Sequence, residues 1–171
     1  MTAPSNRSRL RTGAGLLAAA SALALALPAT AQATYPNQVR YQNGATQKCL
    51  EVADWSTADG APVRQWTCTG GDNQLWERQD GGVLVNVHSH KCLEIPGYST
   101  AWGTQAQQWT CNGGANQQWR ETSVPLSGIS QLFNTNSGLV LDVAGSDPAD
   151  GTPVIQWENT GTSNQYWGRR Y

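Results

Sequence analysis

The sequence predicts an all-β domain assembled from three copies of one unit. Short runs of Val, Leu, Trp and Tyr alternate with Gly, Asn, Asp and Pro, a pattern typical of strands joined by tight turns. No stretch keeps a helical period of apolar residues over about ten residues. The phrase CTGGDNQLW at 68–76 recurs as CNGGANQQW at 111–119 and as NTGTSNQYW at 159–167, which indicates an internal repeat.

Residues 1–33 are predicted to be a secretory signal. Three arginines give this segment a positive start, an apolar run follows at 16–27, and small residues at 31–33 form an A-x-A cleavage site. Cleavage after Ala31 fits the same pattern. We therefore expect a secreted, extracellular domain over 34–171. The apolar run is short for a bilayer span and no second one follows, so no membrane insertion is expected.

The exported part of the chain is acidic. Three of the eleven Lys and Arg residues, and none of the twelve Asp and Glu residues, fall within the first 33 residues. No run of basic residues interleaves with aromatic residues. This composition argues against nucleic acid or an anionic membrane as partner. The remaining length suits one domain, which we expect to be monomeric.

The repeat covers nearly all of the exported part. Segments that begin KCLEV at 48, KCLEI at 91 and LVLDV at 139 align residue for residue as far as their Q-x-W triplets. The copies span about 37–80, 81–123 and 124–171, and are called the first, second and third copy below. Each holds about four strand-like runs, so about twelve strands are expected.

Three copies of this kind favour a small closed β structure. A propeller usually has at least about four blades, and one copy alone cannot bury its apolar face, so the copies must share a core. Tryptophan buries a large area and its N–H needs a partner. The expected core tryptophans are Trp76, Trp119 and Trp167.

The four cysteines predict two disulfides. All lie in the exported part, where an oxidising compartment favours disulfide formation. The same spacing of 19 residues separates Cys49 from Cys68 and Cys92 from Cys111, so these pairs are favoured among the three possible pairings. A zinc site built from all four would need C-x-x-C pairs, which the sequence lacks.

The third copy lacks both cysteines. Val140 and Asn159 stand at the matching positions. The loss of both members together is what a disulfide pair predicts, because one leftover thiol would be a liability in an exported protein.

The triplets at 74–76, 117–119 and 165–167, together with CLEV, CLEI and VLDV, resemble the ricin B-chain-type lectin family. The resemblance covers about 37–171. It implies a β-trefoil, in which a six-stranded barrel is capped by three hairpins. The expected fold is therefore an all-β β-trefoil with three pseudo-symmetric four-strand subdomains.

The resemblance also implies one shallow sugar site in each copy. An acidic residue accepts sugar hydroxyls, a tryptophan stacks on the ring, and an Asn-Gln pair adds hydrogen bonds. The residues at these positions are Glu51, Trp66, Asn73 and Gln74 in the first copy, Glu94, Trp109, Asn116 and Gln117 in the second, and Asp142, Trp157, Asn164 and Gln165 in the third. The family usually has Asp at the acidic position, which only the third copy keeps.

These residue types suit a sugar, which has a face of C–H groups and a rim of hydroxyls. An indole covers the face, a carboxylate accepts charge-assisted hydrogen bonds, and an amide both donates and accepts. Without the resemblance, Trp66, Trp109 and Trp157 would be interpreted as core residues, and the Asn-Gln pairs as turn residues.

We expect a secreted, non-catalytic lectin that binds galactose-type or pentose-based glycans at up to three sites, without metal or cofactor. A glycosidase would need two carboxylates in one cleft, whereas threefold symmetry puts the repeated acids on separate faces. A protein-binding trefoil, such as a protease inhibitor, is the alternative, because fold does not fix function.

Overall fold

The computed structural model describes residues 1–2, 37–124 and 127–171. The predicted secretory signal at 1–33 falls almost entirely outside these ranges and stays a prediction. In the described part, strands and three-residue 3-10 helices are the regular elements. None of the helices described there is long and apolar enough to cross a membrane.

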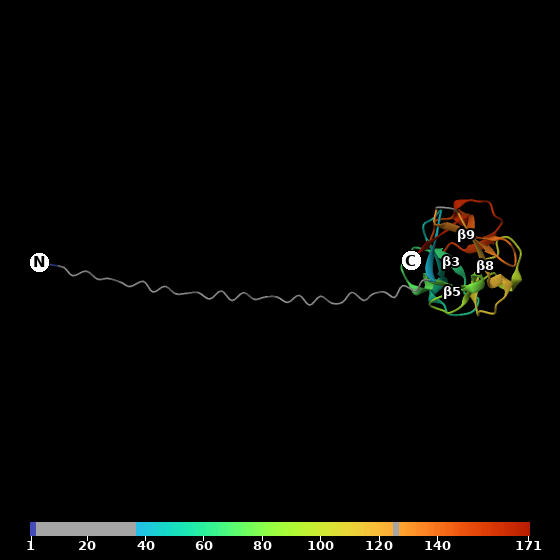
Figure 1. Ribbon diagram of the computed structural model, residues 1–171, viewed down its shortest axis with the longest axis horizontal. Coiled ribbons are helices and arrows are strands. Elements are labelled where there is room, and N and C mark those ends of the chain that lie inside the picture. The colour runs from blue at the N-terminus through green and yellow to red at the C-terminus, as the bar shows by residue number, and fades with distance from the viewer. Residues whose placement is uncertain (3–36, 125–126) are drawn as a thin grey trace. The chain divides into compact units, whose positions relative to one another are not determined.

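Over residues 37–124 and 127–171, twelve strands are present, four in each copy, as the repeat predicts. Figure 1 shows their arrangement. The strands of the first copy are β1 (Gln38–Asn43), β2 (Cys49–Val52), β3 (Val63–Trp66) and β4 (Trp76–Arg78). Those of the second are β5 (Leu84–Asn86), β6 (Cys92–Glu94), β7 (Gln107–Trp109) and β8 (Trp119–Ser123). Those of the third are β9 (Ile129–Asn134), β10 (Val140–Val143), β11 (Val154–Trp157) and β12 (Trp167–Arg170).

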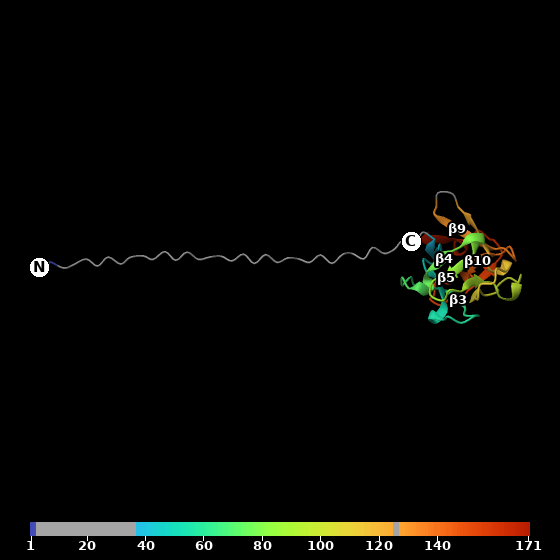
Figure 2. The ribbon, with the colours of Figure 1, turned by 60° about the horizontal axis from the view of Figure 1, so that its bottom comes forward.

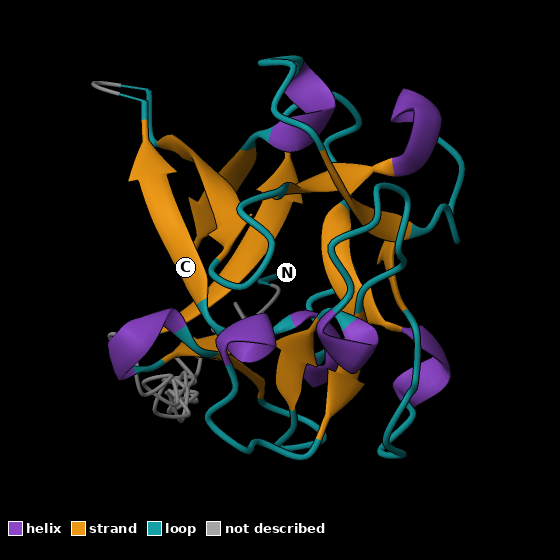
Figure 3. Cartoon of the chain, turned by 90° about the vertical axis from the view of Figure 1, so that its right-hand side faces the viewer, coloured by secondary structure: helices purple, strands orange, loops and turns teal. Residues whose placement is uncertain are grey.

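In the described part of the chain, seven 3-10 helices connect the strands. They lie near the strand ends (Figure 3). They are η1 (Ala53–Trp55), η2 (Asp72–Gln74), η3 (Asp80–Gly82), η4 (Pro96–Tyr98), η5 (Ala115–Gln117), η6 (Ala144–Ser146) and η7 (Ser163–Gln165). Three of them, η2, η5 and η7, carry the Asn-Gln pairs of the three copies.

The outer strands of each copy form a six-stranded barrel. Strand β1 pairs with β4 and with β12, which joins the first copy to the third. Strand β4 pairs with β5, β8 with β9, and β9 with β12. A single bridge between Val83 and Gln118 completes the ring between β5 and β8. The fold is therefore the expected β-trefoil.

The inner strands of each copy form a hairpin, and the three hairpins cap the barrel. They are β2–β3, β6–β7 and β10–β11. Three bridges join the hairpins to one another, between Pro62 and Gln107, Arg64 and Pro153, and Gln105 and Ile155. In Figure 2 the hairpin strand β3 lies at the lower end of the domain and the barrel strand β9 at its upper end.

The tryptophans of the Q-x-W triplets fill the shared core, as predicted. Trp76, Trp119 and Trp167 are completely buried. Each indole N–H donates to a backbone carbonyl 3.0 Å away, on Leu50, Leu93 and Leu141 respectively. These leucines are also completely buried. The triplet therefore links the start of a barrel strand to the hairpin of its own copy.

Buried glutamines join each copy to its neighbour. The amide of Gln65 donates to the carbonyls of Asp147 and Ala149 in the third copy. Gln108 reaches the first copy and Gln156 the second in the same way. Each donor is completely buried and satisfied, so these contacts fix the loops of one copy against the hairpin of the next.

The two disulfides have the favoured pairing, Cys49–Cys68 and Cys92–Cys111. In the third copy Val140 is completely buried. The Asn159 side-chain oxygen accepts a hydrogen bond of 2.8 Å from the amide of Gln131 on β9. A polar contact to a barrel strand therefore stands where the other copies have a covalent link.

Replacing Cys49 and Cys68 together by Ala should lower the free energy of unfolding by about 3 kcal/mol, because the crosslink restricts the unfolded chain. Denaturant unfolding of the secreted protein measures this. Peptide mapping without reduction should recover only the two pairs seen in the structure. A Cys49–Cys92 or Cys68–Cys111 peptide would contradict the alignment of the copies.

Candidate functional site

In every copy the hairpin and the following 3-10 helix bring the predicted residues together. Strand pairing sets Glu51 opposite Arg64, Glu94 opposite Gln107, and Asp142 opposite Ile155. Two residues further along the strand comes the predicted stacking tryptophan, and side chains two apart on a strand share a face. The Asn-Gln pair then approaches the acid from η2, η5 or η7.

The glutamine of each Q-x-W triplet holds the buried acid. The Gln165 amide donates to an Asp142 carboxylate oxygen at 2.8 Å and to the Glu158 carbonyl at 2.7 Å. Its own oxygen accepts from the Thr160 backbone N–H at 2.9 Å. Gln74 and Gln117 make the same three contacts in their copies. All three glutamines are completely buried.

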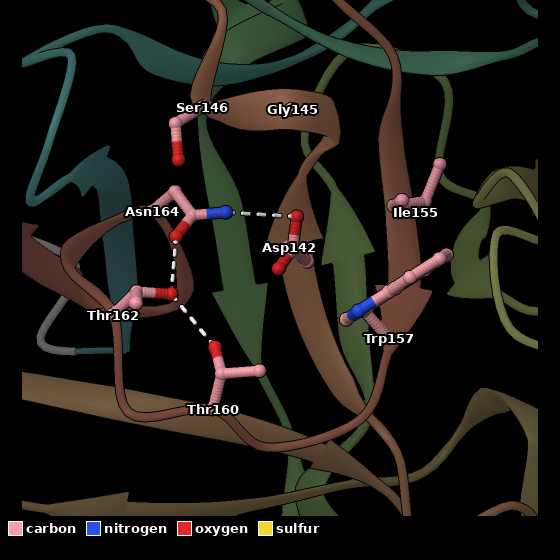
Figure 4. A pocket seen from close by; sticks show the side chains of 8 residues that line it. All are labelled: Asp142, Gly145, Ser146, Ile155, Trp157, Thr160, Thr162 and Asn164. Carbon is pink, nitrogen blue, oxygen red and sulfur yellow. Dashed lines mark hydrogen bonds between the residues drawn. The ribbon is translucent and has the colours of Figure 1, made fainter.

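The third copy contains an open cavity of about 360 Å³. One wall is polar: Thr160, Thr162, Asn164 and Asp142 are joined by hydrogen bonds of 2.7 to 3.0 Å (Figure 4). The facing wall is apolar and consists of Ile155 and the half-buried Trp157. The cavity thus presents hydrogen-bonding groups on one side and an aromatic face on the other.

Burial raises the pKa of Asp142 above its ordinary value, because the carboxylate has lost part of its hydration. The amides of Gln165 and Asn164 donate to the ionised form and oppose this rise. The side chain is therefore a buried acceptor whose charge is sensitive to its surroundings.

The second copy contains a cavity of about 370 Å³ between Tyr98 and Trp109. Gln117 and Asn116 donate to one oxygen of Glu94 at 2.9 and 3.3 Å, and Gln107 donates to the other at 2.8 Å. Trp109 is 40% exposed. The buried Asn116 side-chain oxygen has no hydrogen-bond partner among the described residues. The equivalent oxygen of Asn73 in the first copy is also buried without a partner among the described residues.

In the first copy an arginine occupies the corresponding position. The Arg64 guanidinium donates to one oxygen of Glu51 at 3.0 and 3.1 Å and to Asp54 at 3.0 Å. It also lies 4.2 Å from the centre of the Trp66 ring, in a cation–π contact. Arg64 therefore covers both the acid and the aromatic face that the sequence predicts for a sugar.

The sequence analysis did not identify the residue that lies opposite the acid on the hairpin. This residue is what makes the three copies differ. The signal was present in the alignment, where Arg64, Gln107 and Ile155 occupy one position. Its meaning depends on the hairpin register, since only pairing places this side chain over the carboxylate. The structure also puts Trp66, Trp109 and Trp157 at the surface rather than in the core.

Residues 37–167 match the ricin-type β-trefoil lectin domain family. The chain belongs to this lectin family. Among solved structures it is similar to ThreeFoil, a designed threefold-symmetric protein, with 37% identity and a TM-score of 0.76 over 79% of this chain and 99% of that one. The exo-β-1,3-galactanase 1,3Gal43A of Clostridium thermocellum shares 30% identity, with a TM-score of 0.73, over 84% of this chain and 31% of the enzyme.

Two further proteins are similar to this chain, one in its fold and the other over a short segment only. A ricin B-like lectin of Macrolepiota procera, solved with lactose, is 20% identical with a TM-score of 0.68 over 81% of this chain and 97% of that lectin. A probable lipoprotein, EnvE, of Salmonella typhimurium is 40% identical over 37 residues, which make up 22% of this chain and 21% of that protein. This chain therefore matches about a fifth of that relative's length.

Replacing Gln117 by Leu should lower the free energy of unfolding by about 3 kcal/mol, because it leaves buried polar and charged groups without partners. Gln118→Leu is the matched control. Its side chain is half-buried and donates one 3.2 Å bond to the exposed Gly113 carbonyl. Denaturant unfolding compares the two variants. Equal losses would show that the buried amide has no special role.

Proposed function

We propose that the protein is a secreted, non-catalytic lectin that binds galactose-type or pentose-based glycans at its second and third copies. The observation that carries this proposal is the pairing, in each of these copies, of a buried acid and its amides with a partly exposed tryptophan across one cavity. The two disulfides suit an oxidising exterior. The relative with 30% identity, a galactanase by name, agrees with the galactose type.

The cavities suit the two sides of a sugar ring. Hydroxyls on one edge can donate to the carboxylate of Asp142 or Glu94, which is a stronger acceptor than a neutral group. The C–H face can lie on Trp157 or Trp109. Because the amides already fix each acid in place, little side-chain freedom remains to be lost on binding. No metal is required in this scheme, because every recognition group belongs to the chain.

The same cavities support binding rather than hydrolysis. Among the described residues that line them, each cavity has one carboxylic acid, Asp142 in the third copy and Glu94 in the second. Glycosidases of both common types use two carboxyl groups about 5 to 10 Å apart. A single acid that is held by amides can accept hydrogen bonds from sugar hydroxyls. It has no second carboxyl group beside it to complete the pair that hydrolysis needs.

We place two rather than three sites in the protein because Arg64 closes the first copy. A sugar there would have to displace a guanidinium from two carboxylates and from the Trp66 ring. An arginine paired in this way loses several charge-assisted contacts at once when it moves. Gln107 and Ile155, at the same position in the other copies, leave the tryptophan face open.

Calorimetric titration with galactose and with xylose, in the presence of EDTA, tests this function. We expect weak binding of at least one of them at two sites per chain, because each site buries little area. Trp109→Ala and Trp157→Ala should each remove one site, and the double variant should remove both. Loss of binding in EDTA, or hydrolysis of a glycan, would contradict the proposal.

The Trp109→Ala and Trp157→Ala variants must first be shown to fold, by denaturant unfolding. Trp109 and Trp157 are partly exposed, so each substitution should cost less than the about 3–5 kcal/mol of a core tryptophan. Trp66→Ala should leave two sites. Binding that depends on Trp66 alone would contradict the assignment of sites to copies.

Arg64→Gln gives the first copy the side chain that the second copy has at this position. We expect the number of sites per chain to rise from two to three, because the Trp66 face becomes free while a glutamine amide still holds the acid, as Gln107 does in the second copy. Arg40→Gln is the matched control, since Arg40 donates to the exposed Gly70 carbonyl. A stoichiometry that stays at two in both variants would show that Arg64 is not what closes the first copy.

Binding at the third copy should weaken as the pH falls through the raised pKa of Asp142, because the protonated carboxyl loses its charge and an acceptor site. The loss should begin above the ordinary value of 3.8. The free energy of unfolding changes in the opposite direction. Because the folded pKa of Asp142 is raised above the unfolded value, its contribution to stability falls as the pH rises through the folded pKa. Titration of a Trp109→Ala variant across pH measures the binding, and constant affinity down to pH 3.8 would contradict this role.

A further inference from the structure

Two of the three junctions between copies are locked by an aspartate. Asp59, in the loop after η1, accepts from the Thr110 backbone N–H at 2.7 Å and forms an ion pair with Lys91 at 2.7 Å. Asp150, at the equivalent position in the third copy, makes the same contacts with Thr67 and Lys48. Each aspartate thereby joins its loop to the strand end beside the neighbouring copy's tryptophan.

The third junction has a tryptophan instead. Trp102 aligns with Asp59 and Asp150, and the residues that align with the lysine and threonine partners are Leu139 and Glu158. All three members of the polar lock have therefore changed together. The ring centre of Trp102 lies 5.6 Å from that of Trp157, with the ring planes 49° apart. Among the described residues, Trp157 is thus the one site tryptophan that packs directly against another aromatic ring, whereas Tyr98 lines the cavity of Trp109 without such a contact.

Hydrogen bonds to its backbone hold the loop that carries Trp102, and they leave the outer face of the indole ring exposed. The Gln156 amide donates to the carbonyls of Ser99 and Ala101, both at 2.9 Å, and the Gly103 N–H donates to the Gln156 carbonyl at 2.9 Å. Gly103 has a φ of +78°, and a Cβ there would lie 3.5 Å from the Trp157 ring. These bonds hold the loop on both sides of Trp102, whose side chain is 54% exposed.

Two adjoining apolar side chains at a surface indicate a binding site, whereas a single exposed one does not. Trp102 and Trp157 adjoin one another. A purely structural replacement for the aspartate would be expected to bury the ring. Trp102 does not line the cavity of the third copy, but it contacts Trp157, which does. It therefore extends the aromatic surface outward from the place proposed for the first sugar.

We infer that Trp102 and Trp157 form a two-ring platform, so that the third copy binds two or more consecutive sugars of a glycan chain while the second copy binds one. This inference rests on the proposed lectin function. Neighbouring rings of a glycan are separated by about one ring width and turned relative to each other. Two tilted indoles side by side can each meet one of them, with a stacking gain like that of other aromatic contacts.

The test uses a Trp109→Ala background, in which the third copy is the site that remains. Affinities are measured for galactose against β-1,3-galactotriose and for xylose against xylotriose. Trp102→Ala should reduce the ratio of trisaccharide to monosaccharide affinity by about five- to tenfold, the size of one aromatic contact. An unchanged ratio would overturn the platform and leave the lectin function standing.

A second variant separates stacking from loop anchoring. Trp102→Asp combined with Leu139→Lys and Glu158→Thr rebuilds the polar lock of the other junctions without the indole. It should show the same reduced ratio and an unfolding midpoint equal to that of the background protein. If this variant restores the ratio, Trp102 acts only by anchoring the loop and the platform is wrong. If the background protein binds none of the four sugars, the proposed function fails and the platform with it.

Discussion

A buried carboxylate held by a side-chain amide is the contact on which each copy depends. Glu51, Glu94 and Asp142 are all 4% exposed, and an unpaired charge at such a place would cost several kcal/mol. The glutamine of the Q-x-W triplet supplies the donor and also ties two backbone groups of the loop. Two residues later the triplet's tryptophan enters the core. One short motif therefore fixes the loop, the acid and the barrel strand together.

This arrangement lets the site vary while the fold stays the same. The acid, the amide and the core tryptophan recur in every copy, whereas the residue opposite the acid is Arg64, Gln107 or Ile155. That side chain lies on the outer face of the hairpin, so its replacement leaves the core untouched. The arginine closes one copy, and the other two residues leave a cavity beside the tryptophan. Under the proposed function, divergence at this one outward position is enough to give each copy a different capacity to bind.

Most of the fold could be predicted because it follows from repetition. The equal cysteine spacing gave the disulfide pairs, and the recurring triplets gave three copies with Trp76, Trp119 and Trp167 in a shared core. The resemblance added the barrel with its three caps. The role of Gln65, Gln108 and Gln156 could not be predicted, because their partners belong to a different copy and lie far away in the sequence.

The candidate sites could be predicted as sets of residues but not as open or closed cavities. The alignment placed an acid, a tryptophan and an Asn-Gln pair in every copy, and the structure brings each set together. Whether a cavity remains in the first copy depends on Arg64 reaching back over Glu51 and Trp66. The extent of the aromatic surface beside the third cavity depends on Trp102, which comes from the second copy. Such contacts depend on hairpin register and loop path, which a pattern of residue types does not contain.

The indole N–H signals of the eight tryptophans, followed by two-dimensional NMR during titration with galactose or xylose, test the account most directly. The account predicts that the Trp109 and Trp157 signals shift in proportion to occupancy, while those of Trp66 and of the three core tryptophans stay in place. A Trp66 signal that shifts with the same affinity, or a set of signals in which none moves for either sugar, would contradict it.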